Sequence, residues 1–559
     1  MKPLAVGLLT ALFLGCSPTP PPTVLPSATP TGTPAPSPTA SPSIDPLLVT
    51  TDKGQVRGVK RSGARQFLGI PYAAPPVGGL RWRPPVPPAA WSGIRAATLA
   101  GSVCPQTIPI VDMHAGGENC LFINVETPDP PPQTPAPVMV WIHGGGFTSG
   151  DGLQYNGTNG SVIAKLTGVV VVSFNYRLGP LGFLAHPLLT AEDPTHPSSG
   201  NYGIEDQIAA LKWVRDNIAA FGGDPGNVTI FGESAGGMSV CLHLASQLSA
   251  GLFHRAIIES GPCTPPFSSL AAAEAQGDLF ASKLGCDGSG DVLACLRSKS
   301  QQDVMNALPP DPSFVFTPGT WGSWAPTLDQ YVLDRQVGDR LADGTFNHTP
   351  VLVGANKDEG TLFVAMAQGF SSTPLTADQY PERLKSLLGS DALVTQVMTQ
   401  YPLAAYPDPG AALAAAFGDA FLACPTIRAG QLASPYVPAY IYQFEYPDAQ
   451  FAVHPPFDLG AFHSAEVQFV FQQPPAPGLS LTNEQIQLSN QIMGYWTRFA
   501  ATGDPNGAAA PAWPRFSASQ EYLGLDRTIA TSQGPKAAAC AFWNGLDYLR
   551  PPLTVGGGP

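Results

Sequence analysis

The chain has 559 residues, of which 44% are hydrophobic and 12% are charged. This composition supplies enough apolar side chains for a large buried core. The formal net charge of −13 excludes a protein whose main task is nucleic-acid binding, because phosphates need a basic surface. Length alone would allow several domains, but α/β proteins of this size often form one large domain.

The first residues are typical of an export signal. A lysine follows the first methionine, and the apolar run over residues 4–14 is too short to span a bilayer. The run ends at Cys16 in a sequence similar to a bacterial lipoprotein box, although Phe13 stands where leucine is usual. We expect a signal peptide over residues 1–16 with a lipidated Cys16; the alternative is an ordinary cleaved signal with an incidental cysteine.

Residues 17–45 consist largely of proline, threonine, serine and alanine. Such a segment cannot build a core, and its prolines keep it extended. It is predicted to be a disordered tether between a membrane anchor and a folded domain at residues 46–555. We therefore expect an exported, cell-envelope lipoprotein, with a secreted or periplasmic soluble protein as the alternative.

The folded part is predicted to begin with a hairpin at residues 48–51 and 54–58, followed by two loop-like segments at residues 67–73 and 80–85. Strands and helices alternate after Pro137. Predicted strands are residues 138–142, 169–174, 228–231, 255–260, 350–354 and 439–446; predicted helices are residues 203–221 and 483–500. Residues 263–345 are interpreted as an inserted cap of short helices, and residues 375–432 as helical.

Two glycine-rich turns carry the candidate chemistry. Gly232 and Gly236 flank Ser234 between an apolar strand and a helix, which is typical of a strained turn that exposes a nucleophilic serine. The pattern alone is weak in a chain with 59 glycines. However, three consecutive glycines follow the strand at residues 138–142, where successive N–H groups can converge on one oxygen. Together the two turns favour a serine hydrolase.

The alternation predicts an α/β fold with a large, mostly parallel central sheet covered by helices on both faces. In such sheets the reactive groups lie at the carboxyl ends of the strands. Ser234, Glu359 and the triple glycine all occupy such positions.

The chain resembles the type B carboxylesterases, α/β-hydrolases that include the cholinesterases. The resemblance runs from Gly69–Ala73 to Ala541–Asn544, and its most specific motifs are Glu118–Val125, His143–Phe147, Asn175–Arg177 and Asn201–Gly237. It implies an α/β-hydrolase fold with an inserted cap and a serine esterase activity.

The resemblance implies Ser234 as nucleophile, Glu359 as acid and His463 as base, in the chain order typical of this fold. It also implies three oxyanion-hole donors, Gly145, Gly146 and Ala235. A serine near the acid corresponds to Ser260.

Two alternatives stand beside these roles. His454 is the rival base, but only Gly460–Glu466 matches the family pattern around the histidine. Asp358 is the rival acid, and Glu359 followed by glycine is the family arrangement.

Eight cysteines besides Cys16 fit an exported protein. The resemblance implies three disulfides, Cys104–Cys120, Cys286–Cys295 and Cys424–Cys540. Cys241 and Cys263 are either free thiols or a fourth bridge. No cysteine and histidine spacing is typical of a metal site, and neither a metal nor a cofactor is expected.

In cholinesterases, the loop closed by the first disulfide carries a tryptophan that stacks on the choline cation. Here residues 105–119 contain no aromatic residue, so the cation–π platform is missing. We therefore expect uncharged esters as substrates. Candidate apolar pocket walls are Phe147, Phe314, Trp321 and Trp324, although the last three equally suit core packing.

The sequence predicts a serine carboxylesterase that acts on small ester molecules through an acyl-enzyme, with no nucleic-acid partner and with membrane contact only through the lipid anchor. A lipase or polyester hydrolase is the alternative within the same chemistry. Two further alternatives are not ordinary esterases. One is a binding or adhesion protein on the same fold, and the other is a scavenger that toxic esters acylate and that turns over slowly.

Overall fold

The computed structural model describes residues 45–108, 113–153, 159–308, 324–368, 370, 374–452, 457–508 and 510–546. The predicted signal peptide, Cys16 and the tether up to residue 44 lie outside these residues, so they stay predictions. The folded unit begins at Pro46.

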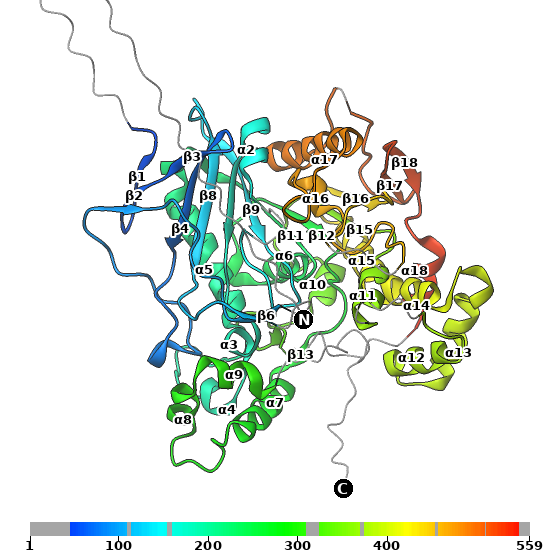
Figure 1. Ribbon diagram of the computed structural model, residues 1–559, viewed down its shortest axis with the longest axis horizontal. Helices are drawn as coiled ribbons and strands as arrows, with labels where there is room; N and C mark the ends of the chain where they lie inside the picture. The colour runs from blue at the N-terminus through cyan, green and yellow to red at the C-terminus, as the bar shows by residue number, and fades with distance from the viewer. Residues whose placement is uncertain are drawn as a thin grey trace, which may run out of the picture. The chain divides into compact units, whose positions relative to one another are not determined.

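An 11-stranded sheet forms the centre of this unit, in the order β18-β17-β16-β15-β12-β11-β9-β10-β8-β4-β3 (Figure 1). Its strands are β3 (Val59–Arg61), β4 (Ala64–Pro71), β8 (Phe122–Pro128), β9 (Ala136–Ile142), β10 (Val170–Phe174), β11 (Gly223–Glu233), β12 (Arg255–Glu259), β15 (Val351–Asn356), β16 (Ala439–Phe444), β17 (Glu521–Leu525) and β18 (Ala530–Gln533).

The strands from β10 to β17 pair in parallel, and antiparallel pairs occur only towards the two edges. The central strands are apolar on both faces because helices cover both. On β9, Val138 and Val140 join one hydrophobic cluster while Met139 and Trp141 join another. This alternation follows the two-residue period of a strand. The expected α/β-hydrolase sheet is confirmed.

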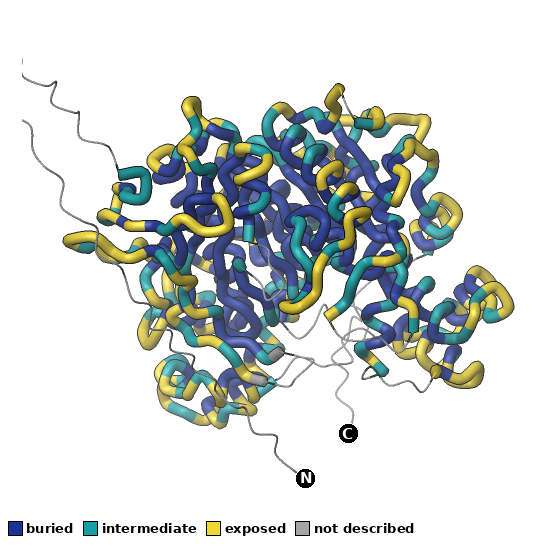
Figure 2. The backbone as a smooth tube through the Cα atoms, turned by 45° about the horizontal axis from the view of Figure 1, so that its top comes forward, coloured by how far each residue is buried: buried dark blue, intermediate teal, exposed yellow. Residues whose placement is uncertain are grey.

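Helices from different parts of the chain cover the two faces (Figure 1). The cluster around Val138 includes side chains of α5 (Tyr202–Asn217), α6 (Ala235–Ala245), α10 (Val337–Asp343) and α15 (Cys424–Ala433). The cluster around Trp141 includes side chains of α2 (Ser161–Thr167), α11 (Gly360–Ala367), α16 (Val467–Val470) and α17 (Asn483–Thr502). Figure 2 shows the buried sheet between more exposed surface segments.

The segment at residues 67–73 was expected to be a loop, and this expectation is wrong for most of it. Residues 64–71 form β4, which pairs with β8, and the register shifts between Phe67 and Ile70. Gly69 has φ +69° at this irregularity. A bulge interrupts the period-two pattern that would have identified the strand. The expected hairpin is confirmed as β1 (Leu48–Thr51) and β2 (Gly54–Arg57), joined by β5 (Ile94–Ala96).

The inserted cap contains short helices, as expected, among its described residues. These are α7 (Leu270–Lys283), α8 (Val292–Ser298) and α9 (Gln301–Ala307), with a small pair of strands, β13 (Ser268–Ser269) and β14 (Thr327–Leu328). The cap helices lie at one end of the sheet in Figure 1.

A second helical region follows β15. It contains α12 (Gln379–Leu388), α13 (Asp391–Gln400), α14 (Pro409–Gly418), a π-helical turn at Asp419–Ala423, and α15. The continuous stretch Pro409–Ala433 is apolar and long enough to cross a membrane by length and composition, but 83% of its most apolar window is buried inside the protein. A buried core helix passes the same test.

The structure contains the three disulfides that the family resemblance implies, Cys104–Cys120, Cys286–Cys295 and Cys424–Cys540. It also pairs Cys241 with Cys263, which resolves the open alternative in favour of a fourth bridge. The Cys424–Cys540 bridge spans 116 residues and ties α18 (Ala537–Asn544) to the start of α15.

Candidate active site

Ser234 lies at the sharp turn between β11 and α6, with φ 57° and ψ −122°. A Cβ added at Gly236 would lie 2.0 Å from the carbonyl oxygen of Ile142, and one at Gly232 would lie 2.6 Å from the carbonyl carbon of Gly236. Strand and helix therefore cross where only glycine fits. The strained backbone lifts the serine hydroxyl above the carboxyl end of the sheet.

The glycine loop leaves β9 directly beside this turn. A Cβ added at Gly144 would lie 3.2 Å from Cβ of Ser234. Gly145 and Gly146 have φ of 103° and 61°, and the carbonyl of Gly145 accepts hydrogen bonds from the amides of Thr148 and Ser149. Among the described residues, the N–H groups of Gly145 and Gly146 donate no hydrogen bond, which leaves them free for a ligand oxygen.

His143 anchors the start of the glycine loop. Its ring stacks on Tyr176 at 4.3 Å, and the hydroxyl of Tyr176 donates to the backbone carbonyl of His143 at 2.9 Å. Burial lowers the pKa of His143 to about 4, so the ring is neutral. This histidine is a structural support and is not a candidate base.

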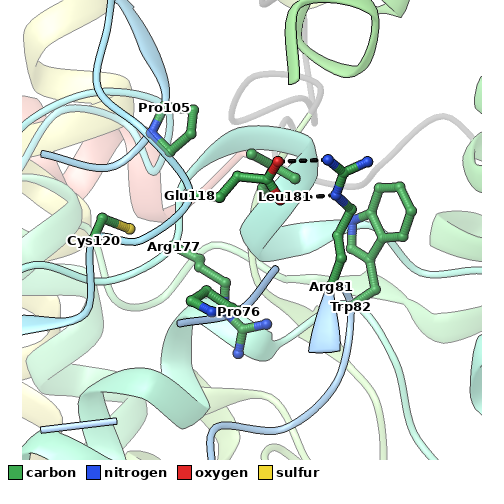
Figure 3. A pocket seen from close by; sticks show the side chains of 8 residues that line it. All are labelled: Pro76, Arg81, Trp82, Pro105, Glu118, Cys120, Arg177 and Leu181. Atoms are coloured by element: carbon green, nitrogen blue, oxygen red, sulfur yellow. Dashed lines mark hydrogen bonds and ion pairs between the residues drawn. The ribbon is translucent and has the colours of Figure 1, made fainter. Parts of the chain in front are cut away.

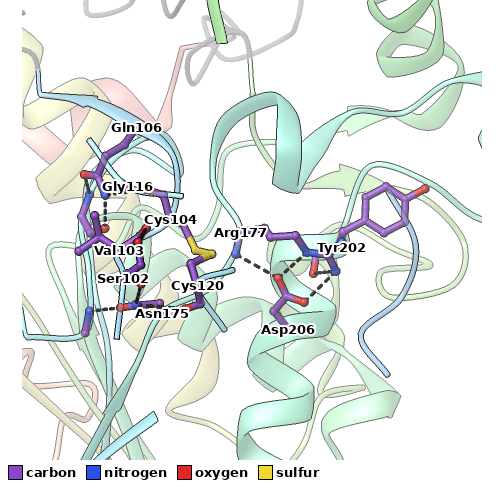
Figure 4. The surroundings of a disulfide bond; sticks show 12 residues. Ser102, Val103, Cys104, Gln106, Gly116, Cys120, Asn175, Arg177, Tyr202 and Asp206 are labelled. Carbon is purple, nitrogen blue, oxygen red and sulfur yellow. Dashed lines mark hydrogen bonds and ion pairs between the residues drawn. A yellow bond between two sulfur atoms is a disulfide. The ribbon is translucent and has the colours of Figure 1, made fainter. Parts of the chain in front are cut away.

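The first disulfide loop braces the far end of the glycine loop (Figure 4). Gln106 donates from its amide to the carbonyl of Gly150 at 3.0 Å, and it accepts from the amide of Gly150 at 2.8 Å. Asn175 donates to the backbone carbonyls of Ser102 and Cys120. The disulfide loop therefore fixes the loop that carries the free amides.

One buried and one partly buried ion pair hold the elements around this site together. Arg177 makes a bidentate contact with Asp206 of α5, visible in Figure 4. Arg81 pairs with both oxygens of Glu118, and its guanidinium also donates to the carbonyl of Lys299 at 2.7 Å (Figure 3). Arg81 therefore connects Glu118 of the first disulfide loop to Lys299 of the cap.

His463 lies against Glu359, although 104 residues separate them in the chain. Nδ1 of His463 is 2.6 Å from Oε2 of Glu359, and the backbone amide of Asn356 donates to Oε1 of Glu359 at 2.7 Å. Both side chains are buried. The carboxylate is thus held on one side by the backbone and orients the imidazole on the other.

Asp358, the rival acid, has a different role. Its Oδ2 accepts a hydrogen bond from the amide of Ala461 at 3.0 Å, and a single β-bridge joins Asp358 to Phe462. Asp358 therefore docks the loop that carries His463, while Glu359 contacts the imidazole itself. The rival base, His454, lies outside the described residues.

Close helix packing positions the acid. A Cβ added at Gly360 would lie 1.9 Å from the carbonyl oxygen of Ala414 in α14, and one at Gly418 would lie 2.6 Å from the amide of Gly360. The turn that carries Glu359 therefore lies directly on α14. Any larger side chain at either glycine would displace the acid.

Glu233, next to the serine, faces the other nitrogen of the imidazole. Its Oε1 lies 3.2 Å from Nε2 of His463. Burial alone lowers the pKa of His463, but the negative charges of Glu233 and Glu359 outweigh it and raise this pKa to about 9. Burial raises the pKa of Glu233 to about 7. No hydrogen bond joins Ser234 to His463 among the described contacts, and such bonds often tighten only with substrate bound.

Ser260 was expected near the acid. Its hydroxyl instead donates to Oε1 of Glu466, at 3.4 Å. The other oxygen of Glu466 accepts from the side-chain amide of Asn356. Asn356 also donates to the carbonyl of Phe462 at 2.7 Å, so this network joins the acid loop to the histidine loop.

The expected pocket walls are only partly described. Phe147 is buried and packs edge-on against Phe183 at 5.2 Å. Trp324 packs on Phe280 of α7 at 5.2 Å and donates to the carbonyl of Leu308, which is a role in cap packing. Phe314 and Trp321 lie outside the described residues.

A cavity of about 450 Å³ lies elsewhere, between residues 84–88 and α5, and none of its lining residues belongs to the Ser234 site. Within the described ranges, no group of three or more histidine, cysteine, aspartate or glutamate side chains could hold a metal ion.

An elbow serine, free loop amides and a buried carboxylate–imidazole pair on this sheet define a hydrolase of the α/β class. The model of the carboxylesterase family matches residues 45–543. The chain is 36% identical over 524 residues to a cocaine esterase from Oryctolagus cuniculus, a match that covers 88% of this chain and 94% of the relative. It is 34% identical to an acetylcholinesterase from Bungarus fasciatus, covering 89% and 86% of the two chains.

A solved structure titled PNB esterase matches with a TM-score of 0.75 and 34% identity, over 89% of this chain and all of that one. The chain therefore belongs to the carboxylesterase family and is a carboxylic ester hydrolase.

Sequence reasoning assigned no role to several buried side chains of the site, namely Glu233, Glu259, Asn356, Tyr442, Glu466 and Trp496. Glu233 could have been found, because it adjoins Ser234 at the end of a buried strand. The others come from separate elements, and only the folded sheet brings them together.

Proposed function

We propose that the protein hydrolyses uncharged carboxylic esters through an acyl-enzyme on Ser234, with His463 as base and Glu359 as acid. The observation that carries this proposal is the buried contact of 2.6 Å between Nδ1 of His463 and Oε2 of Glu359, beside a serine held at a strained turn. A buried carboxylate at Nδ1 fixes the tautomer in which Nε2 can accept a proton.

In the first half of the reaction, Oγ of Ser234 bonds to the ester carbonyl carbon while its proton passes to Nε2 of His463. The bond to the alcohol oxygen then breaks, and the imidazolium gives that proton to the leaving alcohol. In the second half, water attacks the acyl-enzyme, and His463 takes the water's proton and returns it to Ser234 as the carboxylic acid leaves. Glu359 stabilises the imidazolium in both halves.

The amides of Gly145, Gly146 and Ala235 are the proposed oxyanion hole. The first two are free of described acceptors, and Ala235 opens α6, where first-turn amides have no acceptor within the helix. Fixed donors of this kind stabilise the negative charge that develops on the carbonyl oxygen.

The choice of uncharged esters rests on the first disulfide loop. Residues 105–119 contain no aromatic side chain that could bind a quaternary ammonium group. We propose that a thiocholine ester is a poorer substrate than an uncharged thioester with the same acyl group, measured as kcat/KM.

The test is a series of p-nitrophenyl esters from acetate to palmitate, assayed on residues 46–559 and on Ser234→Ala. Loss of the nucleophile is expected to reduce kcat by about 10⁴-fold or more. Ser386→Ala, which changes an exposed hydroxyl on α12, is the matched control and should retain full turnover.

The remaining outcomes separate the alternatives. A rate maximum on long, aggregated esters would favour the lipase or polyester hydrolase. A stoichiometric burst without turnover would favour the scavenger. Turnover that survives Ser234→Ala would place the chemistry on another residue, and no turnover on any ester would favour the binding protein.

We also propose that the protein is anchored to the cell envelope through a lipid on Cys16, as the sequence before the folded unit suggests. Metabolic labelling with a fatty acid should mark the full chain, and Cys16→Ala should abolish both the label and membrane fractionation. A labelled Cys16→Ala protein would contradict the anchor.

A further inference from the structure

A row of polar side chains crosses the sheet at the level of Ser234. Parallel pairing places Glu233 of β11 in register with Glu259 of β12. Glu259 is in turn in register with Gly354 of β15, and Gly354 with Tyr442 of β16. Residues in register on adjacent strands point to the same face, about 4.8 Å apart along the hydrogen-bonding direction. Glu233 and Glu259 are therefore direct neighbours on the face that α17 covers.

Gly354 leaves room within this row. A Cβ added there would lie 2.1 Å from Cδ1 of Tyr442, so the tyrosine ring occupies the space above the glycine. The hydroxyl of Tyr442 is buried and has no hydrogen-bond partner in the described structure. The row thus contains two carboxyl groups and one hydroxyl, all closed off from solvent.

Glu259 is incompletely satisfied if it is a carboxylate. Nε1 of Trp496 in α17 donates to Oε1 of Glu259 at 2.8 Å, but Oε2 is buried and has no partner among the residues that the structure describes. Oε1 of Glu233 lies 3.2 Å from Nε2 of His463, so this carboxylate faces the imidazole. An unpaired carboxylate oxygen beside a second buried carboxylate is strongly unfavourable, whereas a carboxylic acid and a carboxylate can form a strong hydrogen bond.

Charge balance also requires protons in this region. Four buried carboxyl groups, those of Glu233, Glu259, Glu359 and Glu466, interact with one another here, and the imidazole of His463 contacts two of them, Glu233 and Glu359. Burial raises the pKa of Glu259 to about 8, with a smaller contribution from Glu233, and it raises that of Glu466 well above its usual range. The cluster therefore cannot be fully ionised at neutral pH.

Glu466 already has donors of its own, the amide of Asn356 and the hydroxyl of Ser260. Glu259 has one donor and lies in register with Glu233. Because Oε2 of Glu259 is buried without a partner among the described residues and Glu259 is in register with Glu233, Glu259 is the better placed of the two to share a proton with the carboxylate that faces the histidine.

We propose that Glu259 is held as a carboxylic acid that donates its proton in a hydrogen bond to Glu233, so that the two side chains act as one buried monoanion beside His463. Glu259 is in this sense a positioning residue, because it acts on the base through Glu233 and does not touch substrate.

The consequence concerns the base and rests on the proposed function. Full negative charges on both Glu233, which faces Nε2, and its neighbour Glu259 would favour the imidazolium form of His463, which cannot accept the proton of Ser234. A single shared charge leaves the imidazole closer to neutrality. The groups that face Glu259 from the surrounding elements are Glu233 on β11, Tyr442 on β16, Trp496 on α17 and, through charge, Glu466.

The first test is infrared difference spectroscopy of the resting protein against Glu259→Gln. A protonated carboxyl has a C=O stretch well separated from that of a carboxylate. We expect one protonated band at pH 7 that is absent from Glu259→Gln and that disappears as the pH rises through about 8. A carboxylate band in its place at pH 7 would overturn the proposal.

The second test measures the pKa of His463 by NMR in the resting protein. Glu259→Gln keeps a donor and should leave this pKa unchanged. Glu259→Met removes the donor, so Glu233 holds its own proton more strongly and the pKa of His463 falls by about one unit. In a Glu233→Gln background, Glu259→Met should cause no shift.

Equal shifts in the glutamine and methionine variants would show that Glu259 acts through its charge, and no shift in either would show that it only fills space. Both results overturn the proposal. Neither measurement depends on ester turnover, so a failure here is distinct from a failure of Ser234→Ala to lose activity. Glu126→Met, a buried acid remote from His463, is the matched control, and Glu259→Gln keeps the test open if the methionine variant does not fold.

Discussion

Two buried glutamates on the same face of the sheet, Glu126 and Glu259, show how the surroundings decide what an acid does. Glu126 on β8 is in register with Val171 and, on its other side, with Gln66 of β4. Burial raises the pKa of both glutamates to about 8. Yet Glu259 has a tryptophan donor and a second carboxyl group in register, while both oxygens of Glu126 lack a partner in the described part of the chain.

The neighbour of Glu126 explains its state. The amide nitrogen of Gln66 donates to the hydroxyl of Ser161 in α2 at 2.7 Å, and no described residue donates to Oε1 of Gln66. A protonated Glu126 can supply that donor across the strand pair. A protonated glutamate therefore has two different roles in this sheet. Glu126 stabilises a contact between strands under α2, whereas Glu259 changes the negative charge that acts on His463. The position of the nearest titrating group makes the difference.

The largest expected effect comes from Glu359→Gln. Loss of the carboxylate at Nδ1 removes the charge that stabilises the imidazolium, so kcat should fall by about 10⁴-fold with little change in folding. Glu126→Gln, measured in the same ester assay, should leave kcat unchanged. A comparable loss of activity in both variants would erase the distinction between the two buried acids.

Glu126→Gln should instead change stability with pH. Burial raises the pKa of Glu126 in the folded protein from 4.5 to about 8, so this side chain ionises at lower pH in the unfolded chain than in the folded protein. The free energy of unfolding of the wild type therefore falls as the pH rises from 4.5 to about 8, and it levels off above that pH. Glutamine removes this penalty, which amounts to about 3 kcal/mol at pH 7. In denaturant titrations, the wild type and Glu126→Gln should be equally stable at pH 4, and Glu126→Gln should be the more stable protein at pH 7. A constant difference at both would mean that Glu126 is ionised.

Trp496→Phe tests the same comparison at Glu259, because it removes the tryptophan donor that Glu259 has and Glu126 lacks. Losing the indole donor should cost about 1 kcal/mol of stability and raise the pKa of Glu259 further. The protonated carboxyl band should then persist to a higher pH than in the wild type. A band that moves to lower pH would contradict the assigned hydrogen bond.

The smallest effect is expected from Asp358→Asn. The amide oxygen can still accept from the N–H of Ala461, so the histidine loop stays docked, and kcat should fall by less than about tenfold. A loss as large as that of Glu359→Gln would identify Asp358 as the acid instead.

The fold and the Ser234 turn could be read from the sequence because their signals are local. Alternating apolar strands, glycines where backbones cross, and the triple glycine after β9 each predict one element without reference to distant residues. Strand β4 was missed because its bulge breaks the local pattern. The state of Cys241 and Cys263 was undecidable for a similar reason, since pairing depends on how α6 lies relative to the chain after β12.

The carboxyl cluster could not be predicted from the sequence for a physical reason. Glu233, Glu259 and Tyr442 are neighbours through strand register, and register is set by the whole sheet. A glutamate in a strand pattern reads as a solvent-facing residue unless the covering helix is known. Ser260 shows the same limit, because its expected place near the acid did not determine that its hydroxyl would point to Glu466.

Among the described residues, the backbones of the histidine loop and the acid loop pair through one isolated β-bridge, supported by side-chain hydrogen bonds of Asp358 and Asn356. That bridge has no further ladder to support it, so it can open while the sheet remains intact. Enzymatic competence and global folding are then separate transitions. In increasing urea, ester turnover would vanish at a lower midpoint than the circular-dichroism signal of the sheet, and the gap between the two midpoints would report the strength of the contact between the two loops.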